Sequence, residues 1–182
     1  MLPDVFSSER LLYEPLTVAH APELFRALSD ARVTAHLSEA PVSLEEFANE
    51  FATMAAGPPV TRNEERWINF AVRLQSSGDS IGRIQATCYG TWAEVAYMFG
   101  AAWWGQGYAS EAMRWLHAHL SQQYGIAEFW AAVHFANTRS LALLARLKYR
   151  AETLDASRPL RSYEPGDRCF CHGRERAENG HK

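Results

Sequence analysis

The hydrophobic residues of the first sixty positions predict a strand followed by two helices. The segment 10–16 has the composition of a strand, and the segment 17–30 carries its hydrophobic residues at helical spacing. A second helix is expected to begin at Ser43, because Glu46 follows three residues later, as in a capping box. Gly57 and the two prolines after it mark the end of that helix.

Strand-like segments follow one another through the middle of the chain. The segments 66–74, 80–90 and 93–100 are rich in aromatic and branched aliphatic residues, and a turn-forming sequence separates the first two. Three such strands in succession predict an antiparallel meander.

The rest of the chain alternates between helices and strands. A hydrophobic residue recurs every three or four positions from Ala109 to Leu120, which predicts a helix that packs on the sheet. The segment 128–135 has strand composition, a helix is expected to begin at Asn137, and the segment 167–173 supplies a last strand. This order predicts an α/β chain of the α+β type, with a mixed, mostly antiparallel central sheet and about four flanking helices.

Length, composition and charge narrow the class of protein. A chain of 182 residues, 47% of them hydrophobic, can bury one core, so we expect a single domain over 1–174 and a polar tail over 175–182. The net charge of −3 gives no support to a nucleic-acid partner. The sequence contains neither a long apolar run nor a signal-peptide pattern, so we expect a cytoplasmic protein without a membrane partner.

The three cysteines do not predict a disulfide framework, because their number is odd. Cys169, Cys171 and His172 could be taken for metal ligands, but no second Cys/His pair stands at zinc-site spacing elsewhere. Residues two apart on a strand simply share a face. We therefore expect free thiols, Cys88 included, and no metal.

A glycine-rich segment, Gly105 to Ser110, leads directly into the predicted helix after the meander. Its glycines either allow a tight turn only or let an anion approach the amides at the start of the helix. A P-loop is excluded, because no lysine follows Gly107. A dinucleotide-binding fingerprint is disfavoured, because Ser110 stands where glycine or alanine is expected and Glu128 begins its strand instead of ending it.

Several segments, in this order, resemble the GNAT superfamily of acyl-CoA-dependent N-acyltransferases, in the branch of ribosomal-protein N-terminal alanine acetyltransferases. The segment 93–113 is similar to the family's strand, R/Q-x-x-G-x-G/A loop and helix. Segments 8–30 and 137–150 are similar to its opening strand and helix and to its Asn-x-x-Ser helix. Trp104 stands where the family pattern begins with Arg or Gln, so the side-chain part of the phosphate anchor stays open.

The resemblance implies acetyl-CoA (coenzyme A) as co-substrate and a central sheet that is splayed at the cofactor site. The backbone amides of the glycine segment would bind the pyrophosphate, and the pantetheine arm would lie between the strands 93–99 and 129–135. The cofactor-binding residues implied are Met98, Phe99, Gly105, Gln106, Gly107, Ala109, Ser110 and Asn137.

Transfer of an acetyl group to an amine requires a group that takes the proton of the amine. Glu94 is the candidate in the strand before the glycine segment, with Glu64, Glu65 and Asp155 as alternatives. An ordinary surface position at the start of a strand is the other interpretation of Glu94. Tyr97, on the opposite face of that strand, is more typical of a packed core residue.

The thiolate that leaves requires a proton in turn. Many family members place a tyrosine seven residues after the asparagine of the Asn-x-x-Ser helix, and that position is Leu144 here. By resemblance, Ser140 is the candidate that donates the proton or positions a water that does so. The alternative for Asn137 is a helix N-cap, and for Ser140 a hydrogen bond back to that cap.

No histidine has an acidic partner at a spacing that would mark a catalytic triad. His117, His119 and His134 are therefore interpreted as structural or surface residues, with His134 the exception to watch because strand ends face the cleft.

The sequence thus predicts an N-acetyltransferase that moves an acetyl group from acetyl-CoA to a primary amine by direct attack in a ternary complex. The amine is expected on a protein N-terminus or a small molecule, with acceptor walls from residues 31–51 and the last hairpin. The alternatives are a non-catalytic acyl-CoA-binding regulatory module on the same fold and, less favoured, a dinucleotide-dependent oxidoreductase. A monomer and a homodimer are both compatible with the sequence.

Overall fold

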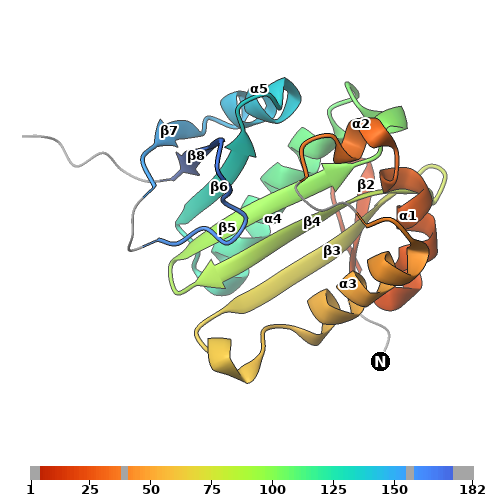
Figure 1. The fold of residues 1–182 in the computed structure, drawn as a ribbon, viewed down its shortest axis with the longest axis horizontal. Coiled ribbons are helices and arrows are strands. Elements are labelled where there is room, and N and C mark those ends of the chain that lie inside the picture. The colour runs from red at the N-terminus through yellow and green to blue at the C-terminus, as the bar shows by residue number, and fades with distance from the viewer. Residues whose placement is uncertain (1–4, 38–40, 155–157, 174–182) are drawn as a thin grey trace, which may run out of the picture.

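A single eight-stranded sheet forms the centre of the molecule (Figure 1). The computed structural model describes residues 5–37, 41–154 and 158–173. The strands run in the order β1-β2-β3-β4-β5-β6-β8-β7, and every neighbouring pair is antiparallel except β5 and β6, which are parallel. Their bounds are β1 Phe6–Ser7, β2 Leu11–Pro15, β3 Arg66–Leu74, β4 Ser80–Tyr89, β5 Trp92–Phe99, β6 Glu128–His134, β7 Arg150–Glu152 and β8 Asp167–His172.

Helices cover both faces of this sheet, and each helical layer packs a hydrophobic core against it. One core packs α4 and α5 on the sheet and contains Leu116 and Leu144, whereas the other packs α1 and α3 and contains Leu24 and Phe51. Figure 1 shows α1 and α3 in front of the sheet and α4 behind it. The helix bounds are α1 Ala21–Leu28, α2 Ala31–Thr34, α3 Leu44–Ala56, α4 Tyr108–Tyr124 and α5 Thr138–Arg146.

The fold class predicted from the sequence is confirmed. Strands β3, β4 and β5 form the expected antiparallel meander, and α4 crosses over from β5 to the parallel strand β6. The sequence missed the short elements β1 and α2, of two and four residues, whereas β7 and β8 form the last hairpin that the resemblance implied. The polar tail expected over 175–182 lies outside the described residues.

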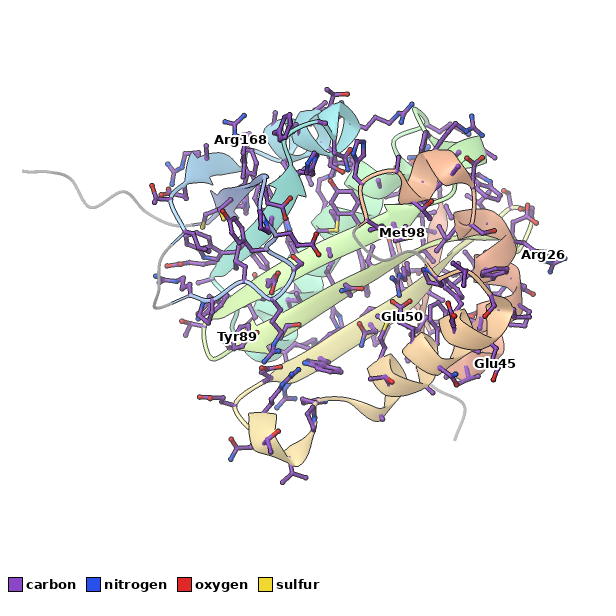
Figure 2. All side chains as sticks on the ribbon, in the orientation of Figure 1. Arg26, Glu45, Glu50, Tyr89, Met98 and Arg168 are labelled. Atoms are coloured by element: carbon purple, nitrogen blue, oxygen red, sulfur yellow. The ribbon has the colours of Figure 1, made fainter. Side chains whose placement is uncertain are left out.

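Strands β5 and β6 separate along their length, as the resemblance implied. They pair only where Trp92, Ala93 and Glu94 face the start of β6, although β5 continues to Phe99. We call the paired part the closed end of β5 and the part from Val95 to Phe99 the open end. Figure 2 labels Tyr89, which pairs with Trp92 at the closed end, and Met98 at the open end.

Among the described residues, no helix has the length and apolar character that crossing a membrane requires.

Candidate active site

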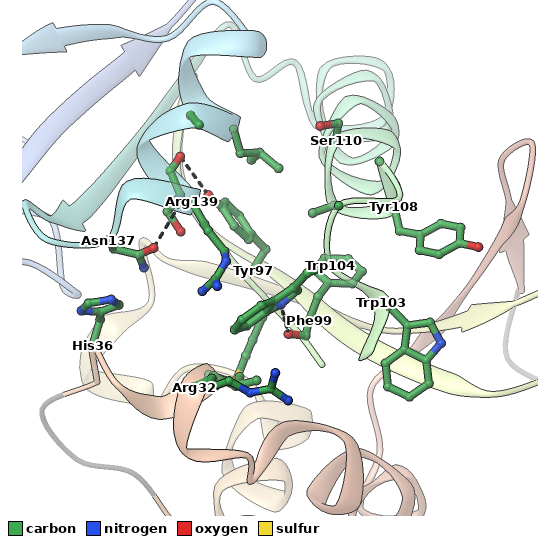
Figure 3. Close-up of a pocket in the computed structure, with 18 of the residues that line it drawn as sticks. Arg32, His36, Tyr97, Phe99, Trp103, Trp104, Tyr108, Ser110, Asn137 and Arg139 are labelled. Carbon is green, nitrogen blue, oxygen red and sulfur yellow. Dashed lines mark hydrogen bonds between the residues drawn. The ribbon is translucent and has the colours of Figure 1, made fainter. Parts of the chain in front are cut away.

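A cavity of about 630 Å³ lies at the open end of β5 (Figure 3). The end of β5, the glycine segment before α4, the first turns of α5 and the short helix α2 line it. Most cofactor residues implied by the sequence line this one cavity: Met98, Phe99, Gly105, Gly107, Ala109, Ser110 and Asn137. Gln106 belongs to the same loop, and its side chain donates to the carbonyl of Ala102.

The glycine segment presents backbone amides to this cavity. Gly105 and Gly107 have φ angles of +77° and +82°, the left-handed region that favours glycine. Gly107 is the N-cap of α4 and supplies no side chain to cap the helix. The first amides of α4 therefore keep their hydrogen-bonding capacity at the positive end of the helix dipole, which suits an anion.

Arg10, the residue before β2, braces this loop, a contact that the sequence did not reveal. The guanidinium of Arg10 bonds the carboxylate of Glu111 in the first turn of α4 at 2.7 Å and donates to the carbonyl of Gln106 at 3.0 Å. Its charge also lies 4.5 Å from the ring centroid of Tyr108. Glu111 accepts further hydrogen bonds from Ser8 and from the backbone of Arg10.

Three arginines, Arg32, Arg139 and Arg146, give the cavity a positive lining, and none of the described lining residues carries a carboxylate. Arg139 lies over the ring of Trp104, 3.9 Å from its centroid. The indole nitrogen of Trp104 donates to the carbonyl of Phe99 at 2.8 Å, which fixes the ring (Figure 3). Trp104 thus holds an arginine at the position where the family pattern itself begins with Arg or Gln.

Asn137 and Ser140 meet at the start of α5, inside the same cavity. The side-chain oxygen of Asn137 accepts the N–H of Ser140 at 3.1 Å, so the predicted N-cap is confirmed. Tyr97 lines the cavity as well, and its hydroxyl donates to the Ser140 carbonyl at 3.5 Å. Burial raises the pKa of Tyr97 to about 12, so this phenol keeps its proton at neutral pH.

Glu94 does not line this cavity, because it lies at the closed end of β5. Its side chain is only 5% exposed and accepts three hydrogen bonds, from the N–H of Arg161 at 2.7 Å, the N–H of Ser162 at 2.9 Å and the Ser162 hydroxyl at 2.6 Å. The interpretation as an ordinary surface residue is therefore wrong. Its predicted role as a base stays a prediction, without a contact that supports it.

The other candidate carboxylates also lie away from the cavity. Glu65 pairs with Arg161 and accepts the indole N–H of Trp67, and Glu64 is exposed. Asp155 lies outside the described residues.

The other histidines and cysteines considered from the sequence lie mostly among packed residues. His117 bonds the Tyr149 hydroxyl at 2.8 Å, and burial, with a smaller effect of nearby His172, lowers the pKa of His117 to about 3. His119 belongs to an aromatic cluster around Trp115. Cys169 and Cys171 are buried free thiols on one face of β8, and His172 faces the opposite side. Among the described residues, no three His, Cys, Asp or Glu side chains form a metal-binding group.

Comparison with known proteins agrees with this architecture. The sequence profile of the acetyltransferase (GNAT) domain matches residues 10–150. A putative ribosomal-protein-serine acetyltransferase from Vibrio cholerae has a TM-score of 0.77 at 21% identity, over 96% of this chain and 100% of that one. An acetyl transferase from Salmonella typhimurium that modifies the N-terminal serine of ribosomal protein L7/L12 has a TM-score of 0.75 at 15% identity, over 94% and 100%. A ribosomal L7/L12 α-N-protein acetyltransferase in complex with coenzyme A has a TM-score of 0.73 at 15% identity, over 93% and 97%.

No curated protein sequence matches the chain. The solved structures share its fold at low identity, whereas the family profile covers most of the chain, from the start of β2 to β7. The neighbours include ribosomal-protein acetyltransferases, consistent with the branch that the sequence resembles. The chain therefore belongs to the GNAT acetyltransferase family.

Proposed function

We propose that this protein transfers an acetyl group from acetyl-CoA to a primary amine in a ternary complex. The observation that carries the proposal is the cavity at the open end of β5. The first amides of α4 and three arginines line it, and none of the described lining residues has a carboxylate. Such a lining suits the phosphates of coenzyme A. A Cβ added to Gly105 would meet no atom within 4 Å, so the space over the loop is open to a ligand.

Each part of the cavity has a role in this proposal. The amides of Gly105, Gln106, Gly107, Ala109 and Ser110 hold the pyrophosphate, and Arg139 on Trp104 supplies the positive side chain of the anchor. The backbone of Met98 and Phe99, which β6 leaves unpaired, receives the pantetheine arm, and the Asn137 amide reaches it as well. Bound acetyl-CoA supplies an activated thioester.

The acetyl acceptor enters from the opposite side of the open end. A second cavity of about 440 Å³, between α1 and α3, shares Met98 and Leu37 with the first. This opening agrees with the acceptor walls expected over residues 31–51. Two of the structural neighbours act on the N-terminus of a ribosomal protein, so a protein α-amine is the first acceptor to test and a small amine the second.

Within the cavity, this chain's own groups position the reaction. A backbone N–H near Met98 and Phe99 faces the thioester oxygen and stabilises the charge that develops there. Ser140 donates the proton that the departing sulfur takes, directly or through a water. The protonated hydroxyl of Tyr97 lies beside it as the alternative donor.

The test measures thiol release from acetyl-CoA with N-terminal peptides, polyamines, aminoglycosides and amino acids. Turnover with an amine supports the enzyme. Stabilisation of the fold by acetyl-CoA without turnover of any amine would instead support the non-catalytic acyl-CoA-binding module, and stabilisation by neither acetyl-CoA nor CoA would overturn both.

A variant of Gly107 tests where the pyrophosphate binds. Gly107→Val forces a β-branched residue into a left-handed conformation and fills the approach to the loop, so acetyl-CoA affinity should fall by about 100-fold or more. Gly90→Val is the matched control, because Gly90 also has a positive φ, +60°, but lies in the turn between β4 and β5. It should lower stability and leave the affinity unchanged. Unchanged affinity in a folded Gly107→Val variant contradicts the placement.

A further inference from the structure

Two histidines from distant parts of the chain meet at the edge of the cavity. His36 follows the short helix α2, and His134 is the last residue of β6. Their rings are nearly parallel, at an interplanar angle of 20°, with centroids 5.7 Å apart. His36 lines the cavity beside Asn137 and is also exposed to solvent (Figure 3). It immediately precedes Leu37, which borders both the coenzyme cavity and the proposed acceptor cavity.

The chemistry of the lining leaves few groups that could accept a proton. Arginine side chains stay protonated in proteins, and the raised pKa keeps the phenol of Tyr97 protonated. No carboxylate lies among the described residues of the lining, and Glu94 is occupied at the closed end. Histidine is the side chain that changes its charge between pH 5 and 8. His36 therefore brings the only imidazole to the described lining of this cavity.

We propose that His36 is the general base of acetyl transfer in this protein, an inference that rests on the proposed function. An acceptor amine arrives largely as ammonium, since an α-amine has a pKa of about 7.7–8.0. The imidazole of His36 takes one proton from it and passes that proton to solvent. The free amine then forms the nitrogen–carbon bond to the acetyl carbonyl, and the carbon–sulfur bond breaks. After the bond forms, the nitrogen loses its second proton, and the departing thiolate takes up a proton, either directly or through Ser140. The products are the amide, the thiol and the one proton released to solvent.

His134 acts as a positioning residue for His36. Its Nδ1 accepts the N–H of Ala136 at 3.3 Å, which fixes its ring plane, and the ring then supports the imidazole of His36. This contact connects α2, at the acceptor side, with the end of β6 that has left β5. The stack therefore holds the imidazole at the wall of the coenzyme cavity, next to Leu37, which borders both cavities.

The charged groups around the pair come from four elements. Arg32 of α2 and Arg139 of α5 line the same cavity, and both are cations. Asp167 of β8 lies opposite His134 in the register, with a carboxylate that accepts the N–H of Glu164 at 3.1 Å. Glu46 of α3 lines the neighbouring cavity and accepts the N–H of Val42. Within the described parts of the chain, none of these four side chains is hydrogen-bonded to His36, so its ring is available to the incoming amine.

The pH dependence of kcat/KM tests the role of His36, with the acceptor that shows the fastest turnover in the amine panel. The wild-type protein deprotonates a bound ammonium, so its kcat/KM should fall less steeply than that of a variant without the base just below the pKa of the acceptor. The His36→Gln variant can use only the free amine, and its kcat/KM should fall about tenfold per pH unit below that pKa. For an α-amine we expect a deficit of up to about tenfold at pH 7 and recovery to within about threefold at pH 9.

Two further variants separate catalysis from structure. His119→Gln removes a histidine outside the cavity and should leave the pH profile of kcat/KM unchanged. His134→Gln should lower kcat at every pH without changing the shape of the pH profile. Stabilisation by acetyl-CoA should be equal in all four proteins. A deficit of His36→Gln that is the same at every pH, no deficit, or the same shift in His119→Gln overturns the role of His36 alone. Absence of turnover by the wild-type protein overturns the proposed function and the role of His36 with it.

Discussion

The polar groups at the two ends of β5 differ in what they are available to bind. At the closed end, Trp92 to Glu94 pair with β6, and the Glu94 carboxylate accepts three hydrogen bonds from residues 161–162. At the open end, Met98 and Phe99 pair with β4 but not with β6, and they line a cationic cavity. Polar groups are satisfied within the protein at one end and kept available for a ligand at the other. The closed end thereby supplies stability that holds the open end in shape.

The separation of the strands has a visible cause in their neighbours. β6 pairs with β8 along its length, from Phe129 to His134, so it follows β8 away from β5. At the far end of the open part, the indole of Trp104 donates to the Phe99 carbonyl. An aromatic side chain thus satisfies one backbone group that a continuing sheet would have bonded, and the remaining groups stay accessible.

The largest effect is expected from removing the hydrogen bonds of Glu94 at the closed end. Glu94→Ala leaves two N–H groups and a hydroxyl of the 161–162 loop without their acceptor, and the free energy of unfolding should fall by about 3 kcal/mol or more. Urea denaturation measures the loss. Glu94→Gln keeps the size of the side chain and tests the prediction from the sequence that Glu94 is a base. If Glu94 only holds the loop, the folded variant keeps kcat within a few-fold; a loss of about 100-fold in kcat would show a catalytic role instead.

The next effect concerns the two hydroxyls of the open end. Ser140→Ala should lower kcat by about 100-fold, with acetyl-CoA affinity and melting temperature nearly unchanged, because the departing sulfur loses its proton donor. Tyr97→Phe is the matched variant, since its hydroxyl lies in the same cavity and hydrogen-bonds to the Ser140 carbonyl. Wild-type kcat in Ser140→Ala, combined with a large loss in Tyr97→Phe, would transfer the role to the phenol.

The difference between the two ends also explains what could be predicted from the sequence. The glycine segment and the helix after it are local, so Gly105, Gly107 and Asn137 were found from spacing and resemblance. The contacts of Glu94 join residues 67 and 68 positions apart, and Arg10 reaches Glu111 across 101 positions. No sequence period records such pairs, because only the folded sheet brings them together.

The same reasoning applies to the cationic lining and to the shortest elements. Arg139 and Arg146 stand seven residues apart on α5, so helical spacing could have suggested a shared face, but not that this face meets Trp104. The strands β1 and β7 have two and three residues, too few for an alternating pattern to show. Their positions depend on pairing with β2 and β8.

A smaller effect is expected on acetyl-CoA affinity when the contact between Arg10 and the glycine loop is removed. Arg10→Gln removes the brace between the loop and the residue before β2, so the amides lose part of their preorganisation and acetyl-CoA should bind roughly tenfold more weakly. Glu111→Gln should have a similar effect, and the double variant should be little worse than either single one. Arg73→Gln, which loses ion pairs with Glu14 and Glu23, is the control that affects stability alone. Additive losses in the double variant would contradict the brace.

The smallest effect probes the closed end by pH. His117 packs on Phe129, which belongs to the paired part of β6, and burial lowers the pKa of His117 to about 3. The unfolded chain therefore binds a proton at this site below about pH 6.5, whereas the folded protein does not until about pH 3. The free energy of unfolding should consequently decrease as the pH falls through this range, by at most about 1.4 kcal/mol per pH unit from this histidine.

Urea denaturation at pH 7 and pH 5 measures this effect as the difference between the two free energies of unfolding. His117→Gln should reduce that difference by about 1–2 kcal/mol. Tyr149→Phe removes the hydrogen bond to His117 but not the buried imidazole, so it should lower stability at both pH values and preserve the difference. An unchanged pH dependence in His117→Gln would mean that water reaches the imidazole and that the closed end is less tightly packed than its contacts indicate.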